Sequence, residues 1–298
     1  MRFSNGIALI QVLLITAMLS IFALFLLSTA KNQVKMSQWS NDKAEALVAL
    51  HNTESNLLFA LLTTSKSPFE QSRVNQSSLL KSEPTIKAKW NFFAKPFFID
   101  DTTEISIQDQ AGLIHAQFPN TEHLRAFISA QGVGVHEANA VVDSLLDWQD
   151  LDTIPRANGY EKSGLTRNGT IPDIHDLFFI KSMTPELLSK LIKVSTIHRK
   201  GSFNPMNSPI ELLAALTNER IAKQVIELRE AGQLTKRSFT QLTGINEDDN
   251  TFFYPSNFLK ITLISKIGES RVYKSITIQL LPYAKNNQRP INVLSSRS

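Results

Sequence analysis

Apolar residues dominate the start of the chain and then recur at helical spacing. The run from Ile7 to Leu27 is uncharged, and only Gln11, Thr16 and Ser20 interrupt it mildly. It supplies the roughly 20 apolar residues that a helix needs to cross a bilayer. Beyond it, leucines recur at helical spacing, with Lys and Glu between them, up to about Thr63. The pattern predicts one long helix that leaves a membrane and continues as an amphipathic stem.

A cleaved secretory signal is the alternative interpretation of this segment. Small residues at Ser28–Lys31 would suit a cleavage site. Signal peptides, however, usually have a hydrophobic region of only about 7 to 15 residues. The length of the run and its continuation into a stem favour a retained helix.

The pattern changes twice in the rest of the chain. After a Ser-rich, polar stretch at 63–84, alternation at Ile105 and Ile107 breaks near Gly112 and resumes at Ile114, which predicts a β-hairpin. From 121 to about 246 apolar residues follow the helical period.

Near the end of the chain the period returns to two on both sides of Gly268, which predicts a second hairpin over 259–280. Strands on both sides of a run of helices indicate an α+β fold. We expect one antiparallel sheet with a large inserted all-α domain.

Composition adds few constraints to this architecture. The 298 residues are 42% hydrophobic and 19% charged, which is typical of globular material. A net charge of +4 is weak evidence for a nucleic-acid partner. The chain has no cysteine, so disulfides, thiolate metal sites and cysteine nucleophiles are excluded.

Histidines and aromatic residues give no catalytic signature. The six histidines show no metal-ligand spacing and accompany no nucleophile motif, so we expect no enzyme and assign them surface or capping roles. Trp148, Phe178 and Phe179 are predicted to pack in the core rather than to form a binding platform.

An acidic loop is the one candidate metal site. Asp147, Asp150 and Asp152 precede Glu161 in a stretch with Pro155, Gly159 and Tyr160, and oxygen ligands at such spacing permit calcium binding. The alternative is a capped helix end, in which the Asp side chains accept from nearby backbone N–H groups and Arg156 offsets their charge.

One functional hypothesis for this chain is a membrane-tethered DNA-binding protein of a competence system. The stretch from Phe203 to Asp249 resembles helix-hairpin-helix modules, in which a Gly-rich turn presents backbone N–H groups to phosphate. Its turn, LTNERIA, lacks glycine. A second, better preserved glycine turn starts at Ser129. Seven basic residues against four acidic ones between Arg199 and Ser238 make a weak phosphate surface, so we expect no nucleic-acid partner.

The whole arrangement resembles the K-type minor pseudopilins of type II secretion. The resemblance covers nearly the whole chain and rests on five stretches in the family's order: NGIALIQVLLITAMLS, EISIQDQAGLIHAQ, LLDWQDLDTIPRANGYE, IHDLFFIKSMTPELLSKL and FNPMNSPIELLAAL. The chain departs from the family pattern at His115 and Gln117, where Asn is typical, and at Asp176, where Glu is typical. It also has fewer acidic residues after Glu161.

The resemblance implies a pseudopilin fold in six segments. These are a leader at 1–6, a transmembrane helix and stem at 7–63, a linker and first β region at 64–118, a helical insert at 119–248, a β-hairpin at 249–285 and a polar tail at 286–298. A prepilin peptidase would cut after Gly6 and N-methylate Ile7. The chain would sit in the bacterial inner membrane with a periplasmic body, in contact with the lipid bilayer and the inner-membrane assembly platform.

The resemblance also implies a place in the assembled fibre. Most pseudopilins have Glu at the fifth residue after the leader, whereas this chain has Gln11, as the K-type group lacks the Glu. A buried Glu needs a cationic partner, which in a filament is the terminal amine of a neighbouring subunit. Gln11 cannot make this pair, although a lone Gln in a membrane helix needs no special role. The family implies a cap that initiates the pseudopilus with the I-type and J-type minor pseudopilins.

Overall fold

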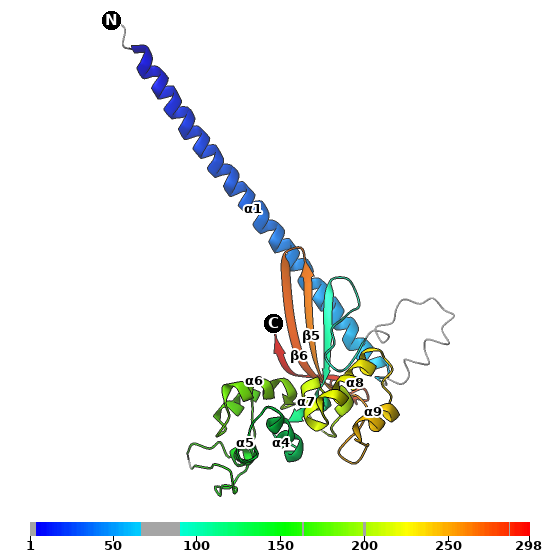
Figure 1. The fold of residues 1–298 in the computed structure, drawn as a ribbon. Coiled ribbons are helices and arrows are strands. Elements are labelled where there is room, and N and C mark those ends of the chain that lie inside the picture. The colour runs from blue at the N-terminus through cyan, green and yellow to red at the C-terminus, as the bar shows by residue number, and fades with distance from the viewer. Residues whose placement is uncertain (1–3, 67–89, 163, 199–200, 286) are drawn as a thin grey trace, which may run out of the picture.

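The computed structural model describes residues 4–66, 90–162, 164–198, 201–285 and 287–298. Helix α1 (Ser4–Thr63) projects from the body as a rod, and the other elements gather around its far end (Figure 1). Its 60 residues make a helix roughly 90 Å long, at about 1.5 Å per residue. The helix includes both the apolar run and the stem, and it ends at the predicted residue. Residues 1–3 of the leader and 67–89 of the linker lie outside the described ranges.

The stem half of α1 packs on a five-stranded antiparallel sheet. Its strands lie in the order β1 (Phe97–Phe98), β2 (Thr103–Asp109), β5 (Phe258–Ile267), β6 (Ser270–Leu280) and β7 (Ile291–Arg297). Leu57 and Leu61 of the stem share a buried core with Ile105 and Ile107 of β2 and Ile261 of β5. The alternation in the sequence therefore marks the sheet face that the stem covers.

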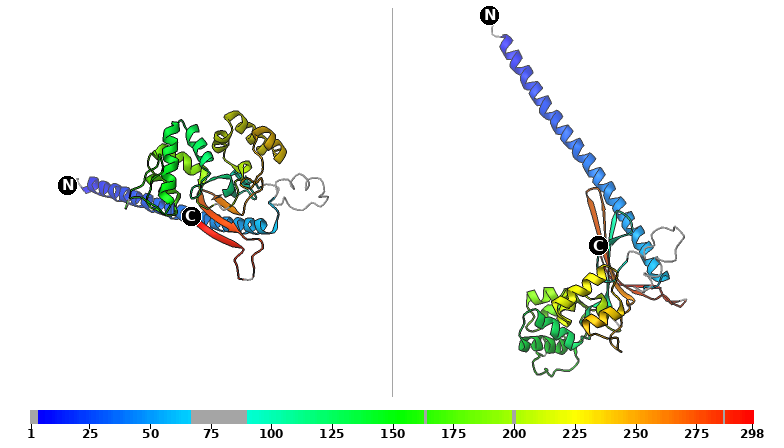
Figure 2. Two further views of the ribbon diagram at one scale, coloured as in Figure 1. Left: turned by 90° about the horizontal axis from the view of Figure 1, so that it is seen from below. Right: turned by 45° about the vertical axis from the view of Figure 1, so that its right-hand side comes forward.

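A helical insert separates the neighbouring strands β2 and β5. Its elements are η2 (Gln110–Gly112), β3 (Ile114–His115), α4 (Thr121–Ala130), α5 (Val135–Gln149), η3 (Ile174–Phe179), α6 (Pro185–Val194), β4 (Ser195–Thr196), η4 (Pro205–Asn207), α7 (Ile210–Leu216), α8 (Glu219–Glu230) and α9 (Lys236–Thr243). The predicted α+β architecture with a large, mainly helical insert is confirmed. The insert is not all α, because it also contains the parallel strands β3 and β4. The insert lies beyond the end of the sheet that is remote from the N-terminus (Figure 2).

The insert contains two hydrophobic cores that meet at α7. The larger core includes Phe127 of α4, Leu145 of α5 and Leu212 of α7. The smaller one includes Leu213 of α7 and Phe239 of α9. Because Leu212 and Leu213 are adjacent, α7 presents different faces to the two cores. The insert is therefore continuous rather than two separate domains.

Asp109 joins the insert to the sheet. It ends β2, its side chain is fully buried, and it faces Leu259 in the register with β5. Its carboxylate accepts hydrogen bonds from Ala111 N at 3.0 Å, Asn207 Nδ2 at 2.9 Å and Asn204 Nδ2 at 3.3 Å. Ser256, just before β5, adds its Oγ at 2.6 Å and its N at 3.2 Å. One carboxylate thus links the start of the insert, its middle and its end. Burial raises the pKa of Asp109, and the hydrogen bonds from Ser256, Asn207 and Ala111 oppose this.

Lys66, just after the stem, reaches the same junction. Its Nζ donates to Ser256 O at 2.6 Å and to Asn257 Oδ1 at 2.5 Å. Burial lowers the pKa of Lys66 to about 8, while the nearby charge of Asp109 acts in the opposite direction. The stem, the sheet and the insert therefore meet around one polar network.

The predicted hairpin around Gly112 is wrong. After Asp109 the chain forms the short helix η2, and β3 pairs in parallel with β4, more than 75 residues further along the chain, in a separate two-stranded sheet. A Cβ on Gly112 would lie 2.5 Å from Asn207 O. Gly112 thus permits close approach of η4, which is a different use of glycine from the turn that the alternation indicated.

The polar tail predicted at 286–298 is also wrong in part, because residues Ile291–Arg297 form β7 at the edge of the sheet. This strand is mostly exposed, and its Asn and Ser residues give no alternation for the sequence pattern to report. Backbone hydrogen bonds to β6 hold it in place. The second predicted hairpin, β5 and β6 around Gly268, is confirmed.

We predict that Asp109→Asn destabilises the protein by about 2 to 4 kcal/mol, because at least one of its donors then faces an amide N–H and stays unsatisfied in a buried site. Urea unfolding monitored by circular dichroism measures this. Asp101→Asn, at an exposed position near the start of β2, is the matched control and should change stability by less than about 0.5 kcal/mol. Equal stability of the two variants would contradict the role given to Asp109.

Candidate functional sites

The N-terminal part of α1 is a bare apolar surface. Exposed fractions between Leu9 and Leu27 are 51–71% for the large apolar side chains, and the body covers none of this segment. The described residues contain one helix that is long and apolar enough to cross a membrane. The hydroxyls of Thr16 and Ser20 donate to Leu13 O and Thr16 O within the helix. These side chains are therefore satisfied without water, as a membrane interior requires.

The predicted processing residues Gly6 and Ile7 lie in the first turns of α1. Gln11 follows one turn later on the exposed surface of the helix. The α-helix thus starts before the proposed cleavage position and continues through it.

The acidic loop follows α5 and is organised by Arg156. Asp147, which is fully buried near the end of α5, accepts from Arg156 Nη1 at 2.5 Å and from Arg156 N. The same Nη1 donates to Asp150. A Cβ on Gly159 would collide with the Asp147 carboxylate, so the loop returns closely over this ion pair. Asp147, one of the predicted calcium ligands, is thus occupied by a protein cation.

The other three predicted ligands converge. One oxygen each from Asp150, Asp152 and Glu161 lies within 4.8 Å of the others. Asn168 joins them: its Nδ2 donates to Glu161 Oε1 at 2.9 Å and to Asp152 O at 2.6 Å. Asp150 Oδ1, Glu161 Oε2 and Asn168 Oδ1 are buried and have no hydrogen-bond donor. Three unsatisfied hard oxygens beside a further carboxylate fit a calcium ion.

The charged form of Glu161 is disfavoured in this cluster. Its loss of contact with water, and next the nearby charge of Asp150, raise the pKa of Glu161 above its ordinary value. Like charges without a cation between them repel, which is the second physical argument that the loop suits a divalent ion.

Two basic residues of the helix-hairpin-helix region, Arg229 and Lys236, are held by contacts within the protein. The turn before α8 is capped by Asn218, which accepts from Ile221 N, rather than by a glycine-rich segment. Arg229 donates to the carbonyls of Met206 and Ser208, and Lys236 pairs with Glu247 at 2.7 Å. Arg199 and Lys200 lie outside the described residues. The geometry gives no support to a phosphate-binding surface here.

Two predictions about individual side chains are corrected. Phe178 and Phe179 are 55% and 64% exposed, so they lie on the surface rather than in the core. Trp148 is partly buried and packs against the larger core of the insert, as predicted, and its ring stacks on Phe179 at 6.1 Å. His115, expected on the surface or at a cap, is buried, and its Nδ1 accepts from Phe118 N. The sequence pattern missed Asn168. This residue has a positive φ of 49° and precedes Gly169, and an Asn-Gly pair is a local signal of a tight turn.

Comparisons with known proteins bear on the whole arrangement. Residues 106–199, which include β3, α4, α5, the acidic loop and α6, match the family model described as type II secretion system protein K. This match, which spans 106–199 of the 298 residues, supports an assignment to the type II secretion system protein K family. The DNA-binding alternative gains nothing from the comparisons. A search of curated proteins finds no match.

The fold of the whole chain also resembles a solved structure. A chain of the GspK-GspI-GspJ complex from the type 2 secretion system of enterotoxigenic Escherichia coli matches 88% of it, and 98% of that chain is covered. The TM-score is 0.50 and the sequence identity is 15%. The match confirms the fold class: a long apolar N-terminal helix, an antiparallel sheet and a helical insert.

Two residues that depart from the K-type pattern, Gln117 and Asp176, make contacts within the insert. Gln117 Nε2 donates to Ile171 O at 2.7 Å and so ties the segment after β3 to the end of the acidic loop. Asp176 pairs with Arg167 at 3.2 Å. Both contacts lie within the fold of the insert, so these changes alter its internal bonding while the architecture is kept.

Proposed function

We propose that the chain is a minor pseudopilin at the tip of the type II secretion pseudopilus. Its α1 would lie in the inner membrane before assembly, with the sheet and insert in the periplasm. There it would join I-type and J-type minor pseudopilins to initiate and cap the fibre through which folded proteins are exported. The role is one of assembly and contact rather than catalysis. The observation that carries the proposal is the continuity of an uncovered apolar helix with a stem that supports the sheet.

The position of the insert supports the cap. It lies at the end of the body opposite the N-terminus of α1, where the next subunit of a fibre would have to stack (Figure 1). The exposed apolar residues Val34, Met36, Leu47 and Val48 remain on the stem for packing with helices below. Gln11 supplies no charge for a subunit above. All three features favour contacts on one side only.

Copurification tests the proposal. Full-length protein made together with the I-type and J-type proteins should be recovered from detergent as a stable complex with both. Isolation of this chain alone, under conditions in which the I-type and J-type proteins are folded and present, would contradict the tip role.

Processing at Gly6 follows from the same proposal. We expect the mature chain to begin at Ile7 with a methylated amine, and we expect Gly6→Arg to block cleavage because the peptidase must accommodate the residue before the bond. N-terminal mass spectrometry of membrane-extracted protein measures both, with Ser4→Ala as a control that should be processed normally. A mature start at Lys31 would instead mean a secretory signal, and a start at Met1 a simple anchor.

We further propose that Asp150, Asp152, Glu161 and Asn168 hold calcium. When bound, the ion would neutralise the carboxylates and fix the loop against the end of α5. Asp147 is not a ligand in this proposal, because its carboxylate stays paired with Arg156.

Calcium at about a hundredfold excess over its dissociation constant should stabilise the protein by about 2.7 kcal/mol, while magnesium should have little effect. Differential scanning calorimetry with and without each metal measures this. Glu161→Gln should remove most of the calcium effect, whereas Asp249→Asn, an exposed acidic residue of the insert, should leave it unchanged. Identical melting curves with calcium and with a chelator would show that the loop is a metal-independent cap.

A further inference from the structure

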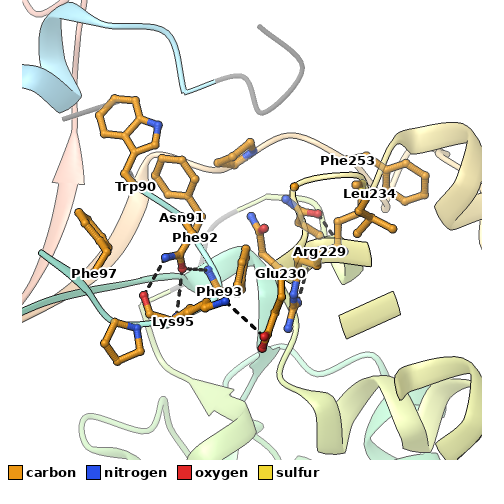
Figure 3. Close-up of a pocket in the computed structure, with 16 residues that line it drawn as sticks. Trp90, Asn91, Phe92, Phe93, Lys95, Phe97, Arg229, Glu230, Leu234 and Phe253 are labelled. Atoms are coloured by element: carbon orange, nitrogen blue, oxygen red, sulfur yellow. Dashed lines mark hydrogen bonds and ion pairs between the residues drawn. The ribbon is translucent and has the colours of Figure 1, made fainter. Parts of the chain in front are cut away.

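A groove of about 300 Å³ lies where the edge of the sheet meets the end of α8. The segment Trp90–Phe97 forms one wall, and Arg229, Glu230, Leu234 and Phe253 come from the insert on the other (Figure 3). The groove is distinct from the acidic loop, which lies after α5. Neither the membrane helix nor the calcium proposal uses any of its residues.

Arg229 is the unusual residue of this groove. Its Nη1 donates to Met206 O at 3.1 Å and to Ser208 O at 2.8 Å, and its guanidinium lies over the ring of Phe93, 4.2 Å from the centroid. Its Nε–H is buried without an acceptor. Burial lowers the pKa of Arg229 to about 10, so it is still charged at neutral pH. No carboxylate of the described residues forms an ion pair with it.

The charges around the groove offset that of Arg229 only in part, through the nearby carboxylate of Glu230. Glu230 is its nearest acidic neighbour along the chain, and the carboxylate of Glu230 pairs with Lys95 across the groove at 3.2 Å (Figure 3). With Lys95 and Glu230 neutralising each other, the lining carries one net positive charge. A largely buried cation without a directly paired carboxylate is costly, and an incoming carboxylate would offset that cost.

The side chains that line the groove indicate what kind of ligand would bring the carboxylate. Phe92, Phe97 and Phe253 make much of the lining apolar, and the buried indole Nε1 of Trp90 is a second donor without an acceptor. The wall is the segment that leads into β1; it bridges to β2 between Phe93 and Gln108. Among the described residues, no further strand lies beyond β1, the two-residue strand at this edge of the sheet. Aromatic walls beside a charged anchor are typical of sites that receive a polypeptide.

We infer that this groove receives an acidic side chain from one of the two partner pseudopilins, with flanking apolar residues against the aromatic wall. The inference rests on the proposed tip complex and names one contact within it. The groove thus connects the partner to both the sheet and the insert.

Photo-crosslinking in the complete complex tests this inference. Phe93 is replaced by benzoylphenylalanine in the full-length chain, which is then purified with the I-type and J-type proteins and irradiated. We expect a cross-link to one partner, at a peptide with Asp or Glu within a few residues.

Arg229→Gln should weaken binding of that partner at least tenfold, and the loss should not add to that from neutralising the partner's acidic residue. Arg220→Gln, exposed on the same helix, should have no effect.

A second variant separates recognition from folding. Glu230→Gln frees Lys95 and raises the positive charge of the groove at an exposed position, so it should tighten binding of the acidic partner severalfold; Glu227→Gln is its control. A defect in folding would not strengthen binding.

If the three proteins form no complex, the proposed function fails. If they form one but Phe93 cross-links only within its own chain, or neither charge variant changes affinity, the groove inference alone is overturned.

Discussion

A single buried carboxylate, that of Asp109, holds the insert on the sheet. Two adjacent antiparallel strands normally need only a short turn between them, but here more than a hundred residues leave at the end of β2 and return at β5. Asp109 accepts from Ala111 as the chain leaves, from Asn204 and Asn207 in η4, and from Ser256 as it returns. Such a network fixes the direction in which a large insert extends.

That direction matters because the protein works at the end of a rod. Lys66 ties the segment after α1 to Ser256, so the rod, sheet and insert share one anchor. The apolar surface of α1 from Leu9 to Leu27 suits lipid before assembly and neighbouring helices afterwards. In the proposed tip role, a firmly held insert at the far end would close the fibre on one side, and the groove beside β1 would offer a contact on the flank.

The fold followed from the sequence wherever burial imposed a period. The stem, the β5–β6 hairpin and the helices of the insert are half-buried elements, and their apolar residues recur accordingly. The sequence-based predictions failed where backbone contacts, rather than side-chain burial, determine the structure. Gly112 serves close packing on Asn207, and β7 is held by its ladder to β6 with most side chains in solvent. Neither leaves a hydrophobic pattern.

The candidate site was partly accessible for the same reason. Four carboxylates close together in the sequence suggested a cation, but the sequence did not show that Arg156 already pairs with Asp147 or that Asn168 contacts Glu161. Both depend on tertiary closure of the loop. Likewise, the lack of a directly paired carboxylate for Arg229 among the described residues is a property of the junction between β1 and α8 and has no local signature.

The location of the insert in assembled fibres tests the central claim most directly. Because the chain has no cysteine, Asp249→Cys at an exposed position of the insert gives a unique attachment point for a gold particle. Electron microscopy of isolated pseudopili should then show one particle at one end of each fibre. Particles distributed along the fibres would contradict the account, because a chain whose insert is fixed beyond the sheet should leave no room for a subunit above it.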